Sequence, residues 1–67
     1  MYTFKLIKNG KEVISPLTTS TVYKTVAYEV WGKMQAFCEH RWGLFGYTYS
    51  LTMFKDGQEL HHIDYEC

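Results

Sequence analysis

Apolar and polar residues alternate along two short stretches of the chain, and each stretch contains a tight-turn signal. Residues 2–14 and 49–61 align without a gap at an offset of 47 positions (49 − 2). Asn9-Gly10 in the first copy corresponds to Asp56-Gly57 in the second. Asn-Gly and Asp-Gly between strand-forming runs are the strongest short-range signal for a two-residue β-hairpin. The pattern therefore predicts two hairpins.

Between the hairpins, apolar residues recur at the spacing of an amphipathic α-helix, from about Thr21 to His40. Thr18 to Ser20 offer an N-cap at the start, and Gly43 and Gly46 favour a turn after the end. Gly32 is unfavourable inside a helix, which predicts that a neighbouring element approaches closely there. The face predicted to be buried comprises Val22, Tyr23, Val26, Ala27, Val30, Trp31, Met34, Phe37 and Cys38.

These elements predict an α+β fold in which residues 1–67 form a single domain. The order is ββαββ, with one amphipathic helix packed on a four-stranded sheet made of the two hairpins. Phe4 to Lys11 (FKLIKNGK) resembles the first hairpin of the immunoglobulin-binding domain of streptococcal protein G, a β-grasp fold. That resemblance implies a sheet whose first and last strands lie parallel at the centre. An antiparallel meander satisfies the local pattern equally well.

The turn positions also predict which side chains face the helix. In the first hairpin these are Phe4, Leu6 and Val13. In the second hairpin an unbroken ladder turns Leu60, His62 and Asp64 inward. It also leaves an apolar outer patch of Ile7, Ile14, Phe54, Ile63 and Tyr65. A β-bulge at His61-His62 would instead bring Ile63 and Tyr65 into the core, and the sequence leaves both registers open.

Composition limits the kinds of partner. Seven basic and seven acidic residues give a formal net charge of +0, so no long-range field attracts nucleic acid or an anionic membrane. No stretch reaches the roughly 18 apolar residues of a membrane span, and the first residues lack a basic region followed by an apolar run. We therefore expect a soluble cytoplasmic protein, in the host cytoplasm if a phage encodes it. It is expected to bind no membrane, and nucleic acid is a weaker candidate partner than protein.

Few residues have the chemistry for a metal or acid–base site; they are Cys38, His40, His61, His62, Asp64 and Cys67. Zinc needs three or four converging ligands, whereas adjacent strand residues such as His61 and His62 point to opposite faces. Two distant cysteines do not form a disulfide framework. The sequence also contains no glycine-rich phosphate loop or serine elbow. It therefore predicts a protein that is not an enzyme and uses no cofactor or metal.

Aromatic residues make up 18% of the chain and give the strongest binding signal. Tyr and Trp, together with Arg, are the residue types that dominate protein interfaces. Trp42 and Phe45 either plug the open end of the core or join Arg41 in a recognition surface. The predicted partner-binding residues are Tyr28, Trp31, Gln35, Glu39, Arg41, Trp42, Phe45 and Phe54.

The leading functional prediction is a small module that binds a larger protein or protein complex and acts by steric occupation. Inhibitors of host defence carried by phages and mobile elements, anti-CRISPR proteins among them, are similar in size and composition. One alternative is a structural module that self-associates as a homodimer. Another is a binder of nucleotides or single-stranded nucleic acid that stacks bases on exposed rings.

Overall fold

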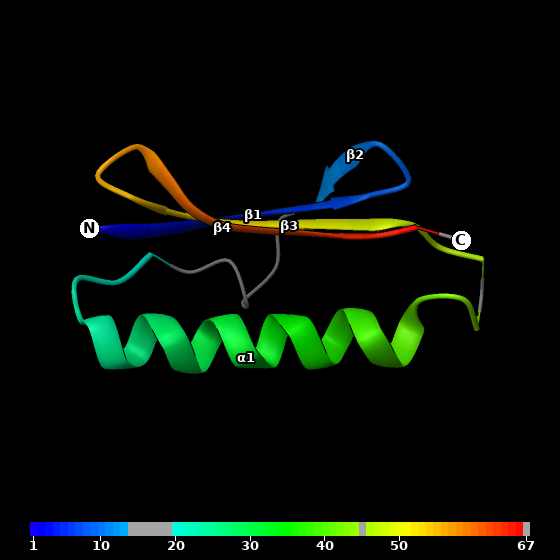
Figure 1. Ribbon diagram of the computed structural model, residues 1–67, viewed down its shortest axis with the longest axis horizontal. Coiled ribbons are helices and arrows are strands. Elements are labelled where there is room, and N and C mark those ends of the chain that lie inside the picture. Colours follow the sequence, from blue (N-terminus) through cyan, green and yellow to red (C-terminus); the bar gives the residue numbers. More distant parts are fainter. Residues whose placement is uncertain (14–19, 45, 67) are drawn as a thin grey trace.

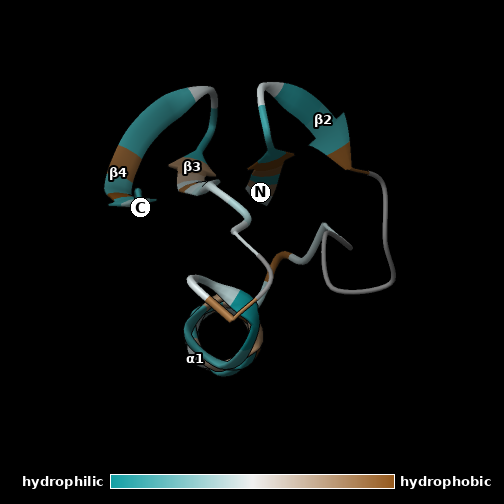
Figure 2. Ribbon diagram, turned by 90° about the vertical axis from the view of Figure 1, so that its right-hand side faces the viewer, coloured by the Kyte–Doolittle hydropathy of each residue, from teal (hydrophilic) through white to brown (hydrophobic). Residues whose placement is uncertain are grey.

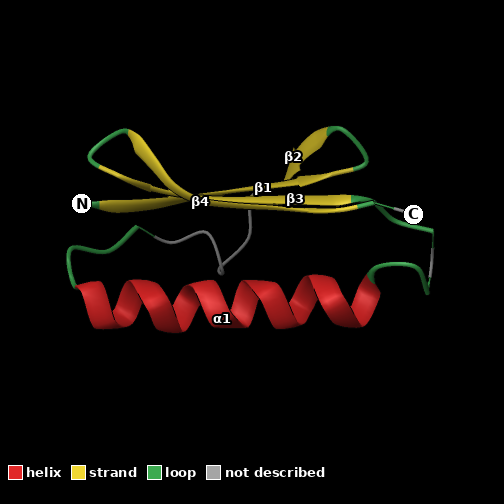
Figure 3. Ribbon diagram, in the orientation of Figure 1, coloured by secondary structure: helices red, strands yellow, loops and turns green. Residues whose placement is uncertain are grey.

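The computed structural model describes residues 1–13, 20–44 and 46–66. In chain order the elements are β1 (Tyr2–Lys8), β2 (Lys11–Val13), α1 (Lys24–Arg41), β3 (Tyr49–Lys55) and β4 (Gln58–Tyr65). They form two layers, with α1 lying along the strands on one face of the sheet (Figure 1). Figure 3 shows the same arrangement by element type, with the helix facing the strands of the sheet. The predicted α+β fold of order ββαββ is confirmed.

The strands neighbour one another in the order β2-β1-β3-β4, and each of the three strand pairs in the described residues is antiparallel. The centre therefore lacks the parallel pair of a β-grasp, and the order also differs from that of a simple meander. β1 and β3 are equivalent strands of the two sequence copies. Lys5 pairs with Thr52, its own counterpart at the offset of 47 (52 − 5). A local two-fold axis through this pair therefore relates the two hairpins.

Both hairpins turn at the predicted dipeptides. The two φ angles are 50° and 82° at Asn9-Gly10, and 50° and 83° at Asp56-Gly57. Positive φ at both central residues is typical of a type I′ turn, whose twist matches that of the flanking strands. Asn and Asp tolerate this conformation better than most residues, and glycine adopts it without strain. The first hairpin has the predicted register, with Leu6 opposite Val13.

The second hairpin contains a β-bulge, which was one of the two registers that the sequence left open. Phe54 pairs with Glu59 but Met53 pairs with His61, so Leu60 is the extra residue. The bulge lies just before the predicted position. Leu60 is 42% exposed, and the expectation that it packs under the helix was wrong. A bulge leaves its extra residue outside the ladder and bends the strand, which explains this exposure.

Beyond the bulge the two faces of β4 are reversed relative to an unbroken ladder. Ile63 and Tyr65 lie opposite Leu51 and Tyr49 and pack against the core. His62 lies opposite Thr52 on the outer face, and Asp64 lies on the same face. The unbroken register, which turned these two polar residues inward, was therefore wrong.

α1 begins three residues later than predicted, because the preceding residues pair with the sheet. Thr21 and Tyr2 exchange two backbone hydrogen bonds of 2.7 and 3.1 Å, which holds this segment in an extended conformation. The N-cap residue is Tyr23, and it makes no side-chain capping hydrogen bond. Ser20 is therefore not the cap, and residues 18–19 lie outside the described part of the chain.

The buried face of α1 is narrower than predicted. Its buried residues are Ala27, Trp31, Met34 and Cys38, with Val30 and Phe37 half-buried beside them. Val22, Tyr23 and Val26 are 62%, 67% and 40% exposed, so the predicted burial of these three was wrong. The late helix start accounts for the first two, which precede α1. Nothing lies within 4 Å of a Cβ built on Gly32, so the predicted close approach at this glycine was also wrong.

The core lies between α1 and the two central strands. Its strand residues are Tyr2, Phe4, Leu6, Tyr49, Leu51 and Met53. Full burial of a large apolar side chain contributes roughly 1.5–3 kcal/mol. Viewed along the strands, α1 lies beneath the central strands, nearer β3 than β1, and β2 and β4 lie at the two edges of the sheet (Figure 2). The helix therefore does not extend beneath β2.

Candidate binding cleft

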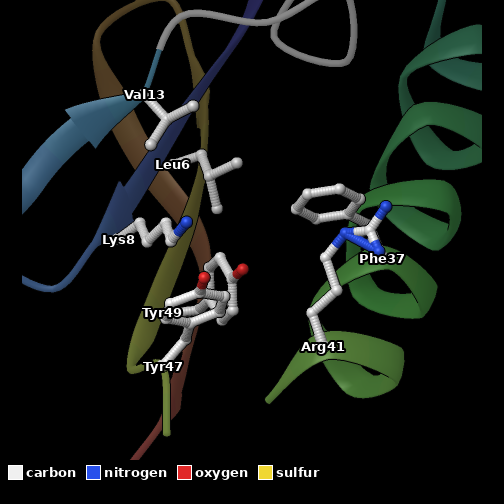
Figure 4. Close-up of a pocket in the computed structure, with 7 residues that line it drawn as sticks. All are labelled: Leu6, Lys8, Val13, Phe37, Arg41, Tyr47 and Tyr49. Carbon is white, nitrogen blue, oxygen red and sulfur yellow. The ribbon is translucent and has the colours of Figure 1, made fainter. Parts of the chain in front are cut away.

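An open cleft of about 350 Å³ lies between the C-terminal half of α1 and the β1–β2 hairpin. We call it the basic cleft. The described residues that line it are Leu6, Lys8, Val13, Phe37, Arg41, Tyr47 and Tyr49. Figure 4 shows the strand residues on one wall and Phe37 and Arg41 on the other. The cleft lies where α1, which runs beneath the central strands, does not extend under β2.

The hairpin register and the helix period place these side chains. Residues alternate between the faces of a strand, so Leu6 and Lys8 share the inner face, where Lys8 lies opposite Tyr49. Phe37 and Arg41 are four residues apart on α1 and therefore project from the same side of the helix. The chain turns after α1 at glycines with positive φ and then reaches Tyr47. An apolar floor results, with a cation on each wall.

Each cation of the basic cleft lies against an aromatic ring. The Lys8 Nζ is 3.8 Å from the centroid of the Tyr47 ring, and the Arg41 Cζ is 4.5 Å from that of Phe37. Cation–π attraction restrains both side chains while leaving their charge unneutralised. Within residues 1–13, 20–44 and 46–66, neither cation forms a salt bridge with a carboxylate. The two positive charges are therefore available to an anion.

Two phenol rings complete the wall on the strand side. Tyr49 is 3% exposed, and its ring meets those of Phe37 and Tyr47 edge-on, at centroid distances of 5.9 and 6.1 Å. Burial raises the pKa of Tyr49, and the neighbouring Cys38 adds to this effect. The hydroxyl of Tyr49 therefore remains protonated at neutral pH and can donate a hydrogen bond.

The sequence predicted a different set of binding residues, and most of them lie on the opposite side of the helix. Tyr28, Trp31, Gln35, Glu39 and Trp42 recur every three or four residues and form one stripe along α1. This stripe faces β4, and we call the junction the α1–β4 seam. Gln35 lies midway along it and is half-buried.

Side chains across the α1–β4 seam contact one another. The Tyr28 hydroxyl lies 3.2 Å from the His61 Nε2, and the His61 ring also packs 5.8 Å from that of Trp31. At the other end, the Tyr65 hydroxyl donates to the Glu39 Oε1 at 3.3 Å, and the Trp42 ring lies 6.2 Å from that of Tyr65. Burial, followed by the Glu39 charge, raises the pKa of Tyr65 to about 12. These four predicted residues therefore connect α1 to the edge strand.

The remaining predicted site residues lie apart from the seam. Arg41 lines the basic cleft, whereas Phe54 is half-buried on the outer sheet face between Thr3 and Glu59. Phe45 lies outside the described residues. The sequence reasoning missed Lys8, Phe37, Tyr47 and Tyr49 as site residues. The inward register of Lys8 and the spacing of Phe37 and Arg41 are signals that could have found them.

The outer sheet face carries a polar relay. The Thr52 Oγ1 lies 2.8 Å from the His62 Nδ1, and the His62 Nε2 lies 2.9 Å from the Asp64 Oδ1. Hydrogen bonds from Ser50 and then His62 hold the pKa of Asp64 below its usual value. Thr52 is 7% exposed, which leaves its hydroxyl little access to a substrate. His61 and His62 lie on opposite faces of β4, as predicted.

The outer face is less apolar than an unbroken ladder would make it. Ile7 and Phe54 lie there and are half-buried, whereas Ile63 and Tyr65 face the core. Ile14 lies outside the described residues. The β-bulge therefore removes two of the five residues from the predicted outer patch.

Comparison of this chain with protein-family models, curated proteins and solved structures finds no match. No helix in the described part of the chain is long and apolar enough to cross a membrane. Within the same residues, His, Cys, Asp and Glu side chains do not gather in groups of three that could hold a metal ion. The assignment of a functional site therefore depends on the geometry of the basic cleft.

Proposed function

We propose that this protein is a small, non-catalytic module that binds a larger protein and acts by occupying part of its surface. The observation that carries the proposal is the basic cleft, where two ring-supported cations flank an apolar floor. Apolar contact area gives affinity, and a few oriented polar groups give specificity. Arg41, which the sequence analysis named, belongs to this site.

The groups that line the basic cleft favour a protein partner over a nucleic acid. A nucleic-acid channel tracks many phosphates with a run of basic residues, and the net charge of this chain is +0. Lys8 and Arg41 instead form two local positive points beside apolar side chains. A protein segment that carries one apolar group and one acidic group matches this arrangement.

We extend the proposal to inhibition of a host defence complex in the cytoplasm, in the manner of phage-encoded anti-CRISPR proteins. Its support is the size of the chain, its neutral charge and its aromatic content of 18%. A module of this kind blocks a larger complex by covering a functional surface, and it needs no catalytic group.

Selection from a displayed peptide library tests the proposal. The wild-type protein is expected to enrich peptides with a shared feature, and Arg41→Glu is expected to lose that enrichment. Lys33→Glu is the matched control, because it reverses the charge of an exposed residue on the same helix but outside the basic cleft. Enrichment that is unchanged in Arg41→Glu, or equally lost in Lys33→Glu, would contradict the proposal.

A further inference from the structure

We propose that the basic cleft receives the C-terminal residue of a partner protein. The apolar side chain of that residue lies on the floor, and its α-carboxylate lies between Lys8 and Arg41. This inference rests on the proposed function and specifies the partner segment.

The floor of the cleft determines the apolar part of the ligand. Leu6 and Val13 come from the β1–β2 hairpin, and Phe37 comes from α1. Both walls of the cleft therefore contribute apolar side chains to its floor. Leu6 is 1% exposed and Val13 and Phe37 are half-buried, which makes the floor part of the folded core rather than a mobile surface. An aliphatic or aromatic side chain that enters the cleft removes apolar area from water on both partners.

The cations determine the charged part. Lys8 and Arg41 extend from opposite walls, and their heads lie beside the rings of Tyr47 and Phe37 (Figure 4). A carboxylate between them gains charge-assisted hydrogen bonds, and a guanidinium can bind both carboxylate oxygens. None of the described residues that line the cleft is acidic, so none of them competes with the ligand.

The size of the cleft favours a chain end over an internal acidic segment. A volume of about 350 Å³ is near the lower limit of ligand pockets, which run from roughly 300 to 1,000 Å³. In an extended peptide, adjacent side chains point to opposite sides, so an apolar residue and a neighbouring acidic residue cannot both enter one small cleft. A C-terminal residue carries its apolar side chain and its carboxylate on the same Cα, and both can enter together.

Isothermal titration with defined peptides tests the inference. The probe is the N-acetylated tetrapeptide Gly-Ser-Gly-Phe with a free C-terminal carboxylate. The comparison peptides are its C-terminal amide and a longer amide in which Glu precedes an internal Phe. We expect the amide to bind about 10- to 100-fold more weakly than the free acid, which is the loss of one charge-assisted hydrogen-bonded contact. Equal affinity of acid and amide would overturn the inference.

Matched variants locate the binding. Arg41→Gln and Lys8→Gln are expected to reduce the preference for the free acid, whereas Lys33→Gln is expected to retain it. An amide proton spectrum of each variant confirms that it is folded. Binding of the internal Glu-Phe peptide that depends on Arg41 but not on a free carboxylate would overturn this inference and preserve the proposed function. Peptide binding that is independent of Arg41 would contradict both, and equally tight binding of free 3-phenylpropionate would assign the cleft to a small acid instead.

Discussion

The Lys8 ammonium lies 3.8 Å from the centroid of the Tyr47 ring and forms one wall of the basic cleft. Tyr47 comes from the connection between α1 and β3, so this contact joins the first hairpin to the segment that follows the helix. A restrained cation loses less conformational entropy when it binds a ligand than a solvated one does. The pair therefore both shapes the cleft and prepares Lys8 for an anion.

Lys8→Met is expected to separate the binding role of this lysine from its structural role. The substitution keeps an unbranched apolar side chain but removes the charge, and loss of a cation–π contact at an accessible site costs about 0.5–1 kcal/mol. Chemical denaturation should therefore show a decrease in unfolding free energy of at most this size, while titration with the free-acid tetrapeptide should show clearly weaker binding. Unchanged peptide affinity would show that Lys8 is only a structural residue.

Leu51→Ala and Leu60→Ala are expected to differ strongly, although both remove the same side chain from the second hairpin. Leu51 is 0% exposed and Leu60, at the bulge, is 42% exposed. Removal of a buried leucine side chain costs about 2–5 kcal/mol, whereas a surface substitution usually changes stability by less than about 0.5 kcal/mol. Urea denaturation measures both. Similar losses in the two variants would contradict the bulged register.

Ser50→Ala is expected to raise the pKa of Asp64, because the Ser50 hydrogen bond is the largest cause of its lowered value. A carboxyl whose pKa is depressed by folding stabilises the protein above its unfolded pKa, and this contribution is lost as the pH falls through the folded pKa. The stabilisation that ionised Asp64 contributes should therefore persist to a lower pH in the wild type than in the Ser50→Ala variant. Carbon-detected NMR titration of Asp64 measures the shift.

Thr3→Ala provides the control for this titration, because Thr3 is the counterpart of Ser50 across the local two-fold axis (3 + 47 = 50). It lies on the outer face opposite Phe54, so its substitution should leave the Asp64 pKa unchanged. A shift of equal size in both variants would mean that the Ser50 hydrogen bond is not the cause.

Cys38 is expected to resist alkylation in the folded protein. It is 0% exposed, and burial, with the Glu39 charge, raises its pKa from 9.0 to about 11. The protonated thiol stabilises the fold below its ordinary pKa, and this contribution is lost as the pH rises toward the folded value. In a Cys67→Ser background, iodoacetamide should react slowly until denaturant is added. Rapid reaction of the native protein would contradict the burial of Cys38.

Local chemistry explains why the fold class could be predicted. Asn9-Gly10 and Asp56-Gly57 specify their turns through nearby backbone preferences, and the helical period needs no knowledge of the sheet. The strand order and the start of α1 depend on contacts between distant residues, such as the pairing of Thr21 with Tyr2. The bulge at Leu60 likewise depends on the packing of Ile63 and Tyr65 against the core.

The candidate site was harder to predict for the same reason. Aromatic enrichment along α1 identified Tyr28 and Trp31, but these rings contact His61 of the same chain. The basic cleft arises from the lateral position of α1 relative to the sheet. From a single sequence it can be predicted that Lys8 lies on the inner face of its strand, and on which side of the helix Arg41 lies. The distance between the two elements that carry these residues cannot be predicted in this way.

Chemical-shift mapping with the free-acid tetrapeptide tests the basic cleft most directly. The measurement follows the amide resonances of the ¹⁵N-labelled protein during the titration. We predict that the largest chemical-shift changes occur at Lys8, Arg41 and Tyr47. The amide resonances of Tyr28 on the α1–β4 seam and of His62 on the outer face are predicted to stay in place. Changes concentrated at Tyr28 or His62, with the resonances of the basic cleft unmoved, would contradict this assignment.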